Sequence, residues 1–211
     1  MRYRQHTYFW LSCTTSGGFA LIKKGPDEFS LQLVILLLIF FVIYLFAGRL
    51  RVDFPDIQDH SKAAERIASG SMLYRDHISY INTYHYPPVF LYTLGGIYYL
   101  FGVNILIVKG VLAVFNILAG LLIYIIARHA FDAKQALFAL LLFLANPLTI
   151  SAVYIGYCDN FVVFFILLSI YMLIRERPLL AGAALAVAFM SKPFPVLFLF
   201  CLLYTSDAAD E

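Results

Sequence analysis

Three aspartates, Asp53, Asp56 and Asp59, stand three residues apart at the start of a polar segment that runs to Pro88. The segment also contains histidines, tyrosines and arginines, and it directly follows a long apolar run. Carboxylate and imidazole side chains take up and release protons, so this combination suits acid–base chemistry. Loops carry function, and titratable groups close to a bilayer are costly without a role. We therefore expect the chemistry of the protein to involve this segment.

The rest of the chain has the composition of an integral membrane protein. Of its 211 residues, 62% are hydrophobic and only 13% are charged. A helix needs about 20 apolar residues to cross a bilayer. We therefore predict an all-α protein, a polytopic bundle of transmembrane helices with a helical first loop. The predicted spans are Phe29–Ala47, Ile105–Ala127, Ala136–Tyr154, Phe161–Ile174, a shorter Leu179–Met190, and a helix that begins at Val196.

The distribution of basic residues sets the orientation of these helices. Cytoplasmic loops are enriched in Lys and Arg, so Lys23 and Lys24 place the N-terminus inside and the loop 48–86 outside. The segment Pro87–Phe101 is short, aromatic and opened by two prolines, and we predict that it is an interfacial or re-entrant helix. With that choice the later basic loops fall inside, and Asp159 shares the extracytoplasmic face with the first-loop aspartates.

Other kinds of site and signal receive no support from the sequence. Residues 1–28 form a mildly basic cytoplasmic tail without a convincing cleavage site, so the first apolar run is interpreted as a signal anchor. Cys13 and Cys158 form no CxxC motif or even disulfide framework, and no basic stripe predicts nucleic-acid binding. Residues 201–211, CLLYTSDAADE, back-translate to a sequence that resembles a transposase sequencing adapter. We interpret this tail as non-native and residues 29–200 as a truncated membrane domain.

The order of short motifs along the chain resembles the GT-C superfamily of membrane glycosyltransferases. In that superfamily the first external loop carries an Asp, then a helix that ends in Gly with a Tyr soon after. Here Asp56 is followed by a polar stretch that ends at Gly70, and Pro87-Pro88 matches the prolines that open a juxtamembrane helix. A Gly-x-x-Asp motif at 156–159 and a Lys-x-x-Pro motif at 192–195 follow in the same order.

The resemblance implies an enzyme that moves a sugar from a polyprenyl-phosphate carrier to a hydroxyl of a glycan, lipid or protein. It is most similar to protein O-mannosyltransferases and aminoarabinose transferases, which implies an active site on the extracytoplasmic face of the plasma (inner) membrane. Asp56 would be the general base, with Asp59 as the next choice. The residues that would bind substrate or phosphate are Arg75, His77, His85, Asp159 and Lys192.

Each of these residues also has an ordinary structural role open to it. Asp56 and Asp159 could cap helices, and Lys192 could extend to the membrane interface. The loop cations could simply be solvated. A transporter, a flippase or a non-catalytic subunit of cell-envelope glycan assembly is the alternative function, and charges within the spans would favour it. The long spans hold almost none, Lys109 being the exception, which favours chemistry at the surface.

The chain departs from the metal-dependent branch of the superfamily at one position. Those enzymes pair the second-loop Asp with an acidic residue two positions later, and here Phe161 stands there. A divalent cation prefers six or more oxygen ligands, many of them from carboxylates. We therefore predict no metal ion and no other cofactor, with a divalent cation as the less favoured alternative.

Overall fold

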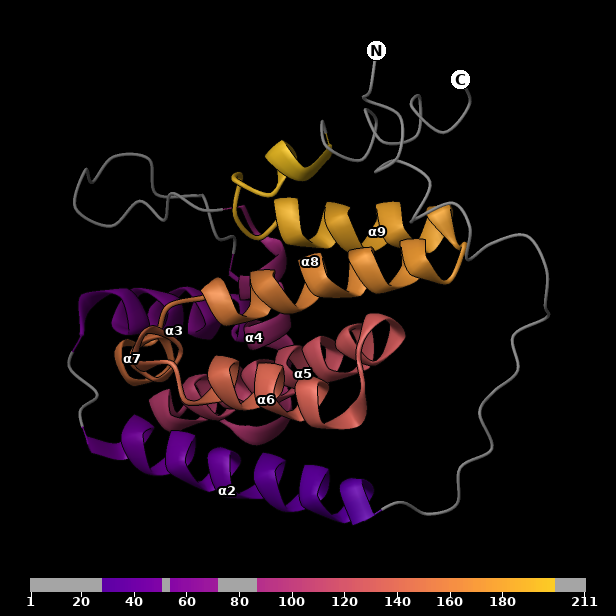
Figure 1. Cartoon of the computed structure of the whole chain (residues 1–211). Helices are drawn as coiled ribbons and strands as arrows, with labels where there is room; N and C mark the ends of the chain where they lie inside the picture. Colours follow the sequence, from indigo (N-terminus) through magenta and orange to yellow (C-terminus); the bar gives the residue numbers. More distant parts are fainter. Residues whose placement is uncertain (1–27, 51–53, 72–86, 200–211) are drawn as a thin grey trace.

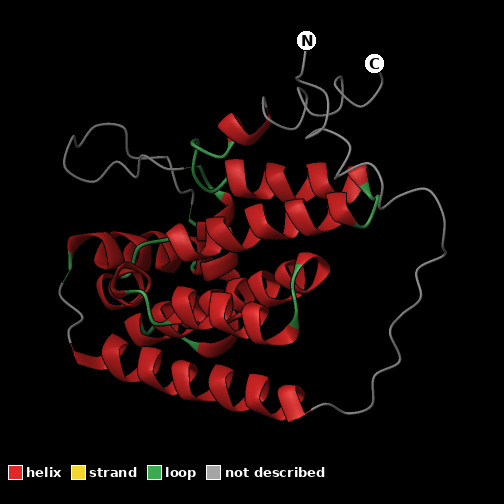
Figure 2. Ribbon diagram, in the orientation of Figure 1, coloured by secondary structure: helices red, strands yellow, loops and turns green. Residues whose placement is uncertain are grey.

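A computed structural model describes residues 28–50, 54–71 and 87–199, and the regular structure of these residues is helical throughout (Figure 2). The predicted all-α fold is confirmed. Asp53, Arg75, His77 and His85 lie outside the described residues. The helices are α2 (Glu28–Leu50), α3 (Pro55–Ala68), α4 (Val89–Phe101), α5 (Ile105–Ala130), α6 (Ala133–Leu144), α7 (Pro147–Ile155), α8 (Asp159–Ile174) and α9 (Pro178–Phe189).

Two of the described helices are long and apolar enough to cross a membrane, namely α2 over Leu31–Leu50 and α5 over Ile105–Ala130. Both agree with predicted spans. The helices α8 and α9 are apolar but have only 16 and 12 residues. At 1.5 Å per residue they measure about 24 and 18 Å, less than the thickness of the hydrocarbon core. The chain is helical again from Val196, as predicted.

The predicted span Ala136–Tyr154 is not one straight helix. The structure divides it into α6 and α7, which are bent by 44° and are together long and apolar enough for one broken span. Pro147 has no N–H to continue the first helix, and the Asn146 side chain accepts a hydrogen bond from Leu148 N–H at 2.8 Å and so caps α7. The break frees carbonyl groups at the end of α6. One of these, Leu144 O, accepts a hydrogen bond of 2.7 Å from the hydroxyl of Tyr44 on α2.

The loop helix α3 is amphipathic, and it packs its apolar face on α4 and α5 (Figure 1). Its buried residues are Ile57, His60, Ala63 and Ala64. Two glycines allow this close approach. A Cβ at Gly95 would lie 2.5 Å from Ile67, and one at Gly156, whose φ is +96°, would lie 2.6 Å from Ile57. The glycine of the Gly-x-x-Asp motif is therefore what lets α3 lie against the turn before α8.

Both termini of α4 lie at the end of the bundle that carries α3. The Val89 N–H donates to Met190 O at the end of α9, at 3.1 Å. At the other terminus, residues 102–104 connect α4 directly to the start of α5. Near that start, Lys109 Nζ donates to Tyr154 O in the last turn of α7, at 2.7 Å. This placement gathers α3, α4 and the turn before α8 at one end of the bundle, and that Pro87–Phe101 does not span stays a prediction.

Candidate active site

Two predicted site residues from distant parts of the chain form an ion pair. Lys192 Nζ donates to Asp159 Oδ1 at 2.6 Å, and their side chains are 21% and 37% exposed. Asp159 is the first residue of α8. The N-cap residue of this helix is Cys158, and no side chain makes a capping hydrogen bond there. The alternative that Asp159 caps the helix is therefore wrong. Its negative charge is nevertheless favoured in the first helical turn, and it holds the ammonium group of Lys192 at this end of the bundle.

The two candidate bases lie in the first turns of α3 but differ in exposure. Asp56 is half-buried and Asp59 is exposed. The N-cap residue of α3 is Phe54 and Pro55 follows it, so the alternative of Asp56 as the N-cap is also wrong. The ring of Phe54 meets that of Tyr154 on α7 edge-on, with centroids 5.3 Å apart. This contact fixes the start of α3 against the end of α7.

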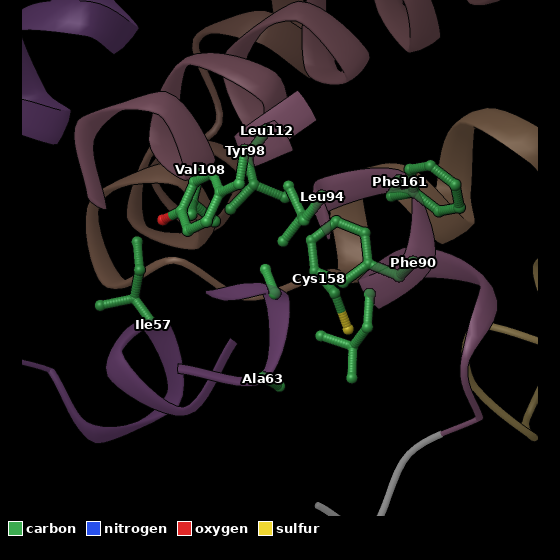
Figure 3. Close-up of a cluster of buried hydrophobic side chains, with 11 residues drawn as sticks. Ile57, Ala63, Phe90, Leu94, Tyr98, Val108, Leu112, Cys158 and Phe161 are labelled. Atoms are coloured by element: carbon green, nitrogen blue, oxygen red, sulfur yellow. The ribbon is translucent and has the colours of Figure 1, made fainter. Parts of the chain in front are cut away.

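Cys158 is a buried residue on which the charges of Lys192, Asp159 and Asp56 all act. Figure 3 shows it in the buried cluster that also contains Ile57 of α3 and Phe90 of α4. Burial raises the pKa of its thiol to about 11; the nearby Lys192 charge opposes this rise, and Asp159 and, less strongly, Asp56 add to it. The thiol is therefore uncharged at neutral pH. Asp56, Asp159 and Lys192 all lie near enough to act on the same buried atom.

His60 belongs to this region, although the sequence reasoning did not select it. Its side chain is 2% exposed, and its ring stands edge-on to Phe90 with centroids 5.2 Å apart and an interplanar angle of 83°. Its pKa is lowered from 6.5 to about 4, chiefly by burial and also by the charge of Lys192, while Asp159 opposes the shift. The imidazole is neutral at pH 7. Helical spacing could have revealed it, because Ile57, His60 and Ala64 fall on one face.

The position that carries an acidic residue in metal-dependent GT-C enzymes is an apolar contact here. Phe161 is buried, with its ring centroid 5.2 Å from that of Phe90 and 4.6 Å from that of Phe115. Within the described ranges, no three His, Cys, Asp or Glu residues converge as a metal site would require. The position of the second acidic ligand is thus filled by an aromatic side chain that packs on other rings.

Lys109, the one cation noted within a predicted span, contacts the neighbouring helices. It is 2% exposed, and its ammonium lies 5.6 Å from the centre of the Tyr154 ring in addition to its bond with Tyr154 O. Cations are favoured at the carboxyl end of a helix, which is where this carbonyl lies on α7. Lys109 therefore joins α5 to α7 at the same end of the bundle as the ion pair.

Comparison with known proteins identifies the family. A family model of dolichyl-phosphate-mannose-protein mannosyltransferases matches residues 85–206, which is more than half of the chain. The chain belongs to this family. It is therefore a membrane glycosyltransferase of the GT-C type, and the expectation from motif order is confirmed at that level. Among curated proteins and among solved structures, no match was found.

The matched region covers only part of the candidate site. Asp159, Lys192 and His85 lie within it, whereas Asp56 and Asp59 precede it. The match also enters the segment 201–211, whose adapter origin stays a prediction. The family match therefore does not bear on the roles of Asp56 and Asp59, which are inferred from the position of α3.

Proposed function

We propose that this protein transfers a sugar from a polyprenyl-phosphate carrier to an acceptor hydroxyl at the extracytoplasmic face of the plasma membrane. Asp56 is the general base, with Asp59 as the second choice, and Lys192, held by Asp159, binds the phosphate of the carrier. The family name points to mannose as the sugar. The acceptor is a glycan, a lipid or a protein. Arg75, His77 and His85 supply further positive charge to the phosphate.

The proposed reaction needs two groups at the anomeric carbon of the sugar: a base near the acceptor hydroxyl that attacks this carbon, and a cation near the phosphate that leaves it. The acceptor O–H gives its proton to the Asp56 carboxylate as its oxygen bonds to the anomeric carbon of the sugar. The bond from that carbon to the phosphate oxygen breaks, and its electron pair leaves with the polyprenyl phosphate. Lys192 stabilises the charge that develops on this oxygen, as a positioned ammonium does in a partly desolvated site.

The observation that carries the proposal is the docking of α3 on the turn before α8. Ile57 packs so close to Gly156 that a Cβ at position 156 would have no room. Asp56 precedes Ile57 in the chain. The half-buried carboxylate is thereby placed at the same end of the bundle as the Asp159–Lys192 pair. A base and a cation supplied by separate elements, both partly desolvated, suit transfer between an acceptor hydroxyl and a phosphate-linked donor.

Substitution of the base tests the proposal. Asp56→Asn keeps the size and hydrogen-bonding capacity of the side chain, but an amide does not accept the proton at neutral pH. In the full-length enzyme, we expect its turnover with a polyprenyl-phosphate-linked sugar to fall by ~10²–10⁴-fold, the usual contribution of a general base. The affinity for the donor should change little, because the base contacts the acceptor.

Asp59→Asn is the matched control on the same helix. Asp59 is exposed where Asp56 is half-buried, so its loss should affect turnover less. Full turnover of Asp56→Asn together with loss in Asp59→Asn would move the base to Asp59. Full turnover of both variants would refute a catalytic role for α3.

A further inference from the structure

The start of α3 packs on the carboxyl end of α7, on both sides of the proposed base. The ring of Phe54, two residues before Asp56, meets the ring of Tyr154 edge-on, with centroids 5.3 Å apart. Ile57, the residue after Asp56, packs so closely on Gly156 that a Cβ there would lie 2.6 Å from it. Figure 1 shows the short helix α7 beside α3. The position of the Asp56 carboxylate therefore depends on where the end of α7 lies.

Lys109 of α5 holds this end of α7. Its ammonium donates a hydrogen bond of 2.7 Å to the carbonyl oxygen of Tyr154 and lies 5.6 Å from the centre of the ring of the same residue. The stem of Lys109 also packs on α2, because a Cβ at Gly48 would lie 3.4 Å from the Cβ and Cδ atoms of the lysine. Lys109 is 2% exposed. One buried side chain therefore connects α2, α5 and α7 at the residue on which Phe54 packs.

A buried ammonium is a costly way to stabilise a helix bundle. Moving a charged group from water into an apolar interior costs free energy, and a neutral side chain would fill the same space at lower cost. An ammonium does, however, make charge-assisted hydrogen bonds, which are shorter and stronger than bonds between neutral groups. The Tyr154 carbonyl is in the last turn of α7, where carbonyl groups lack partners within the helix and the helix end frays. The bond from Lys109 therefore suits a helix end that must keep one position.

We propose that Lys109 is a positioning residue that keeps Asp56 in place for proton transfer. The inference rests on the proposed function and adds to it a residue that supports the base from outside α3. The ammonium fixes the backbone of Tyr154, the ring of Tyr154 supports Phe54, and Phe54 precedes the turn that carries Asp56. Lys109 acts through these contacts and not on the substrate. Its loss should therefore lower kcat and leave the affinity for the donor unchanged.

A comparison of two variants of the full-length protein in lipid nanodiscs tests this role. Lys109→Met keeps most of the apolar stem but removes the ammonium. Tyr44→Phe is the matched control, because the Tyr44 hydroxyl also donates a buried hydrogen bond of 2.7 Å to a carbonyl at a helix end, Leu144 O, but joins α2 to α6. We expect kcat for sugar transfer to fall ~10–10²-fold in Lys109→Met, since a small displacement of a catalytic group has effects of this size. It should stay unchanged in Tyr44→Phe.

Two further variants separate positioning of the base from general loosening of the bundle. In the Asp56→Asn background, Lys109→Met should have almost no further effect on kcat, because the base that it displaces is absent. Lys109→Arg keeps a charged donor for the Tyr154 carbonyl and should restore most of the rate that Lys109→Met loses. The affinity for polyprenyl phosphate without a sugar should be the same in Lys109→Met and in the unmodified protein.

Hydrogen exchange of the α3 backbone measures the same contacts without an assay of transfer. The first turn of α3 is closed by a hydrogen bond from Gln58 N–H to Phe54 O, at 3.2 Å. This N–H should exchange faster in Lys109→Met and at the unmodified rate in Tyr44→Phe, because only the first variant releases the surface on which the turn packs.

The outcomes distinguish this inference from the proposed function. Unchanged exchange in Lys109→Met, equal losses of kcat in Lys109→Met and Tyr44→Phe, or a full further loss in the Asp56→Asn background would each overturn the positioning role. If the unmodified protein transfers no sugar, the proposed function fails. The exchange measurement then still decides whether Lys109 holds the start of α3, because faster exchange in Lys109→Met alone supports that contact and unchanged exchange refutes it.

Discussion

The two ends of the helix bundle use charged residues differently. At the end that carries α3, Asp159 and Lys192 are 33 positions apart in the chain, yet they form a partly buried ion pair. At the opposite end, Asp132 caps α6 by accepting a hydrogen bond from Gln135 N–H at 2.8 Å, and the side-chain oxygen of Gln135 accepts one from Asp132 N–H. Asp132 and Gln135 are both exposed.

The difference separates charges that help to form a helix from charges that a site requires. A capping box satisfies backbone groups within one turn and costs little desolvation, because water still surrounds the side chains. An ion pair between distant segments costs desolvation and needs several elements to hold it. Perturbed and partly buried titratable groups gather at functional sites, so the α3 end is the better candidate for chemistry.

The largest effect expected from this comparison comes from neutralising one carboxylate at each end. Asp159→Asn leaves the partly buried Lys192 without its counter-charge, and we expect kcat/KM for sugar transfer to fall about tenfold as the ammonium loses its position. Asp132→Ala removes the cap of α6 and should lower the free energy of unfolding by about 1 kcal/mol while transfer stays unchanged. Transfer assays and thermal unfolding on both full-length variants check this. An equal loss of transfer in the two variants would erase the distinction between the ends.

The smallest effect expected is that of a chelator. Phe161 is buried among aromatic rings at the position where a metal-dependent enzyme would carry its second acidic ligand. We therefore expect sugar transfer by the full-length enzyme to keep its rate when EDTA is added. A clear loss of rate that manganese or magnesium restores would show that carboxylates from other segments complete a cation site at the α3 end.

Much of the fold follows from patterns that are local in the sequence. The long apolar runs predict α2 and α5 because length and composition alone decide whether a helix can cross a bilayer. The break between α6 and α7 was also encoded locally, in Asn146 followed by Pro147. It was missed because the apolar content of the run outweighed one proline, and a kinked helix has the same composition as a straight one.

The site was predictable only in part, because its contacts join distant segments. The sequence supplied Asp159 and Lys192 as separate candidates, but it does not state that they meet, since that depends on how α8 and α9 pack. It marked Asp56 over Asp59 by motif position alone, and the difference in exposure comes from the docking of α3. His60 was missed because it lies in a polar segment whose composition is that of a solvated loop. Only the helical spacing of Ile57, His60 and Ala64 indicates that it is on the buried face of α3.

The placement of the two ends relative to the membrane is the central claim, and thiol labelling tests it most directly. In full-length protein whose native cysteines, Cys13 and Cys158 among them, are replaced by serine, single cysteines are introduced at the exposed positions Ser71, Tyr157, Lys134 and Arg177. Intact cells are then treated with a membrane-impermeant thiol reagent. We predict labelling from outside at positions 71 and 157, and labelling at 134 and 177 only after the membrane is opened. Labelling of position 134 from outside would mean that Pro87–Phe101 crosses the membrane, and it would contradict the extracytoplasmic placement of the site.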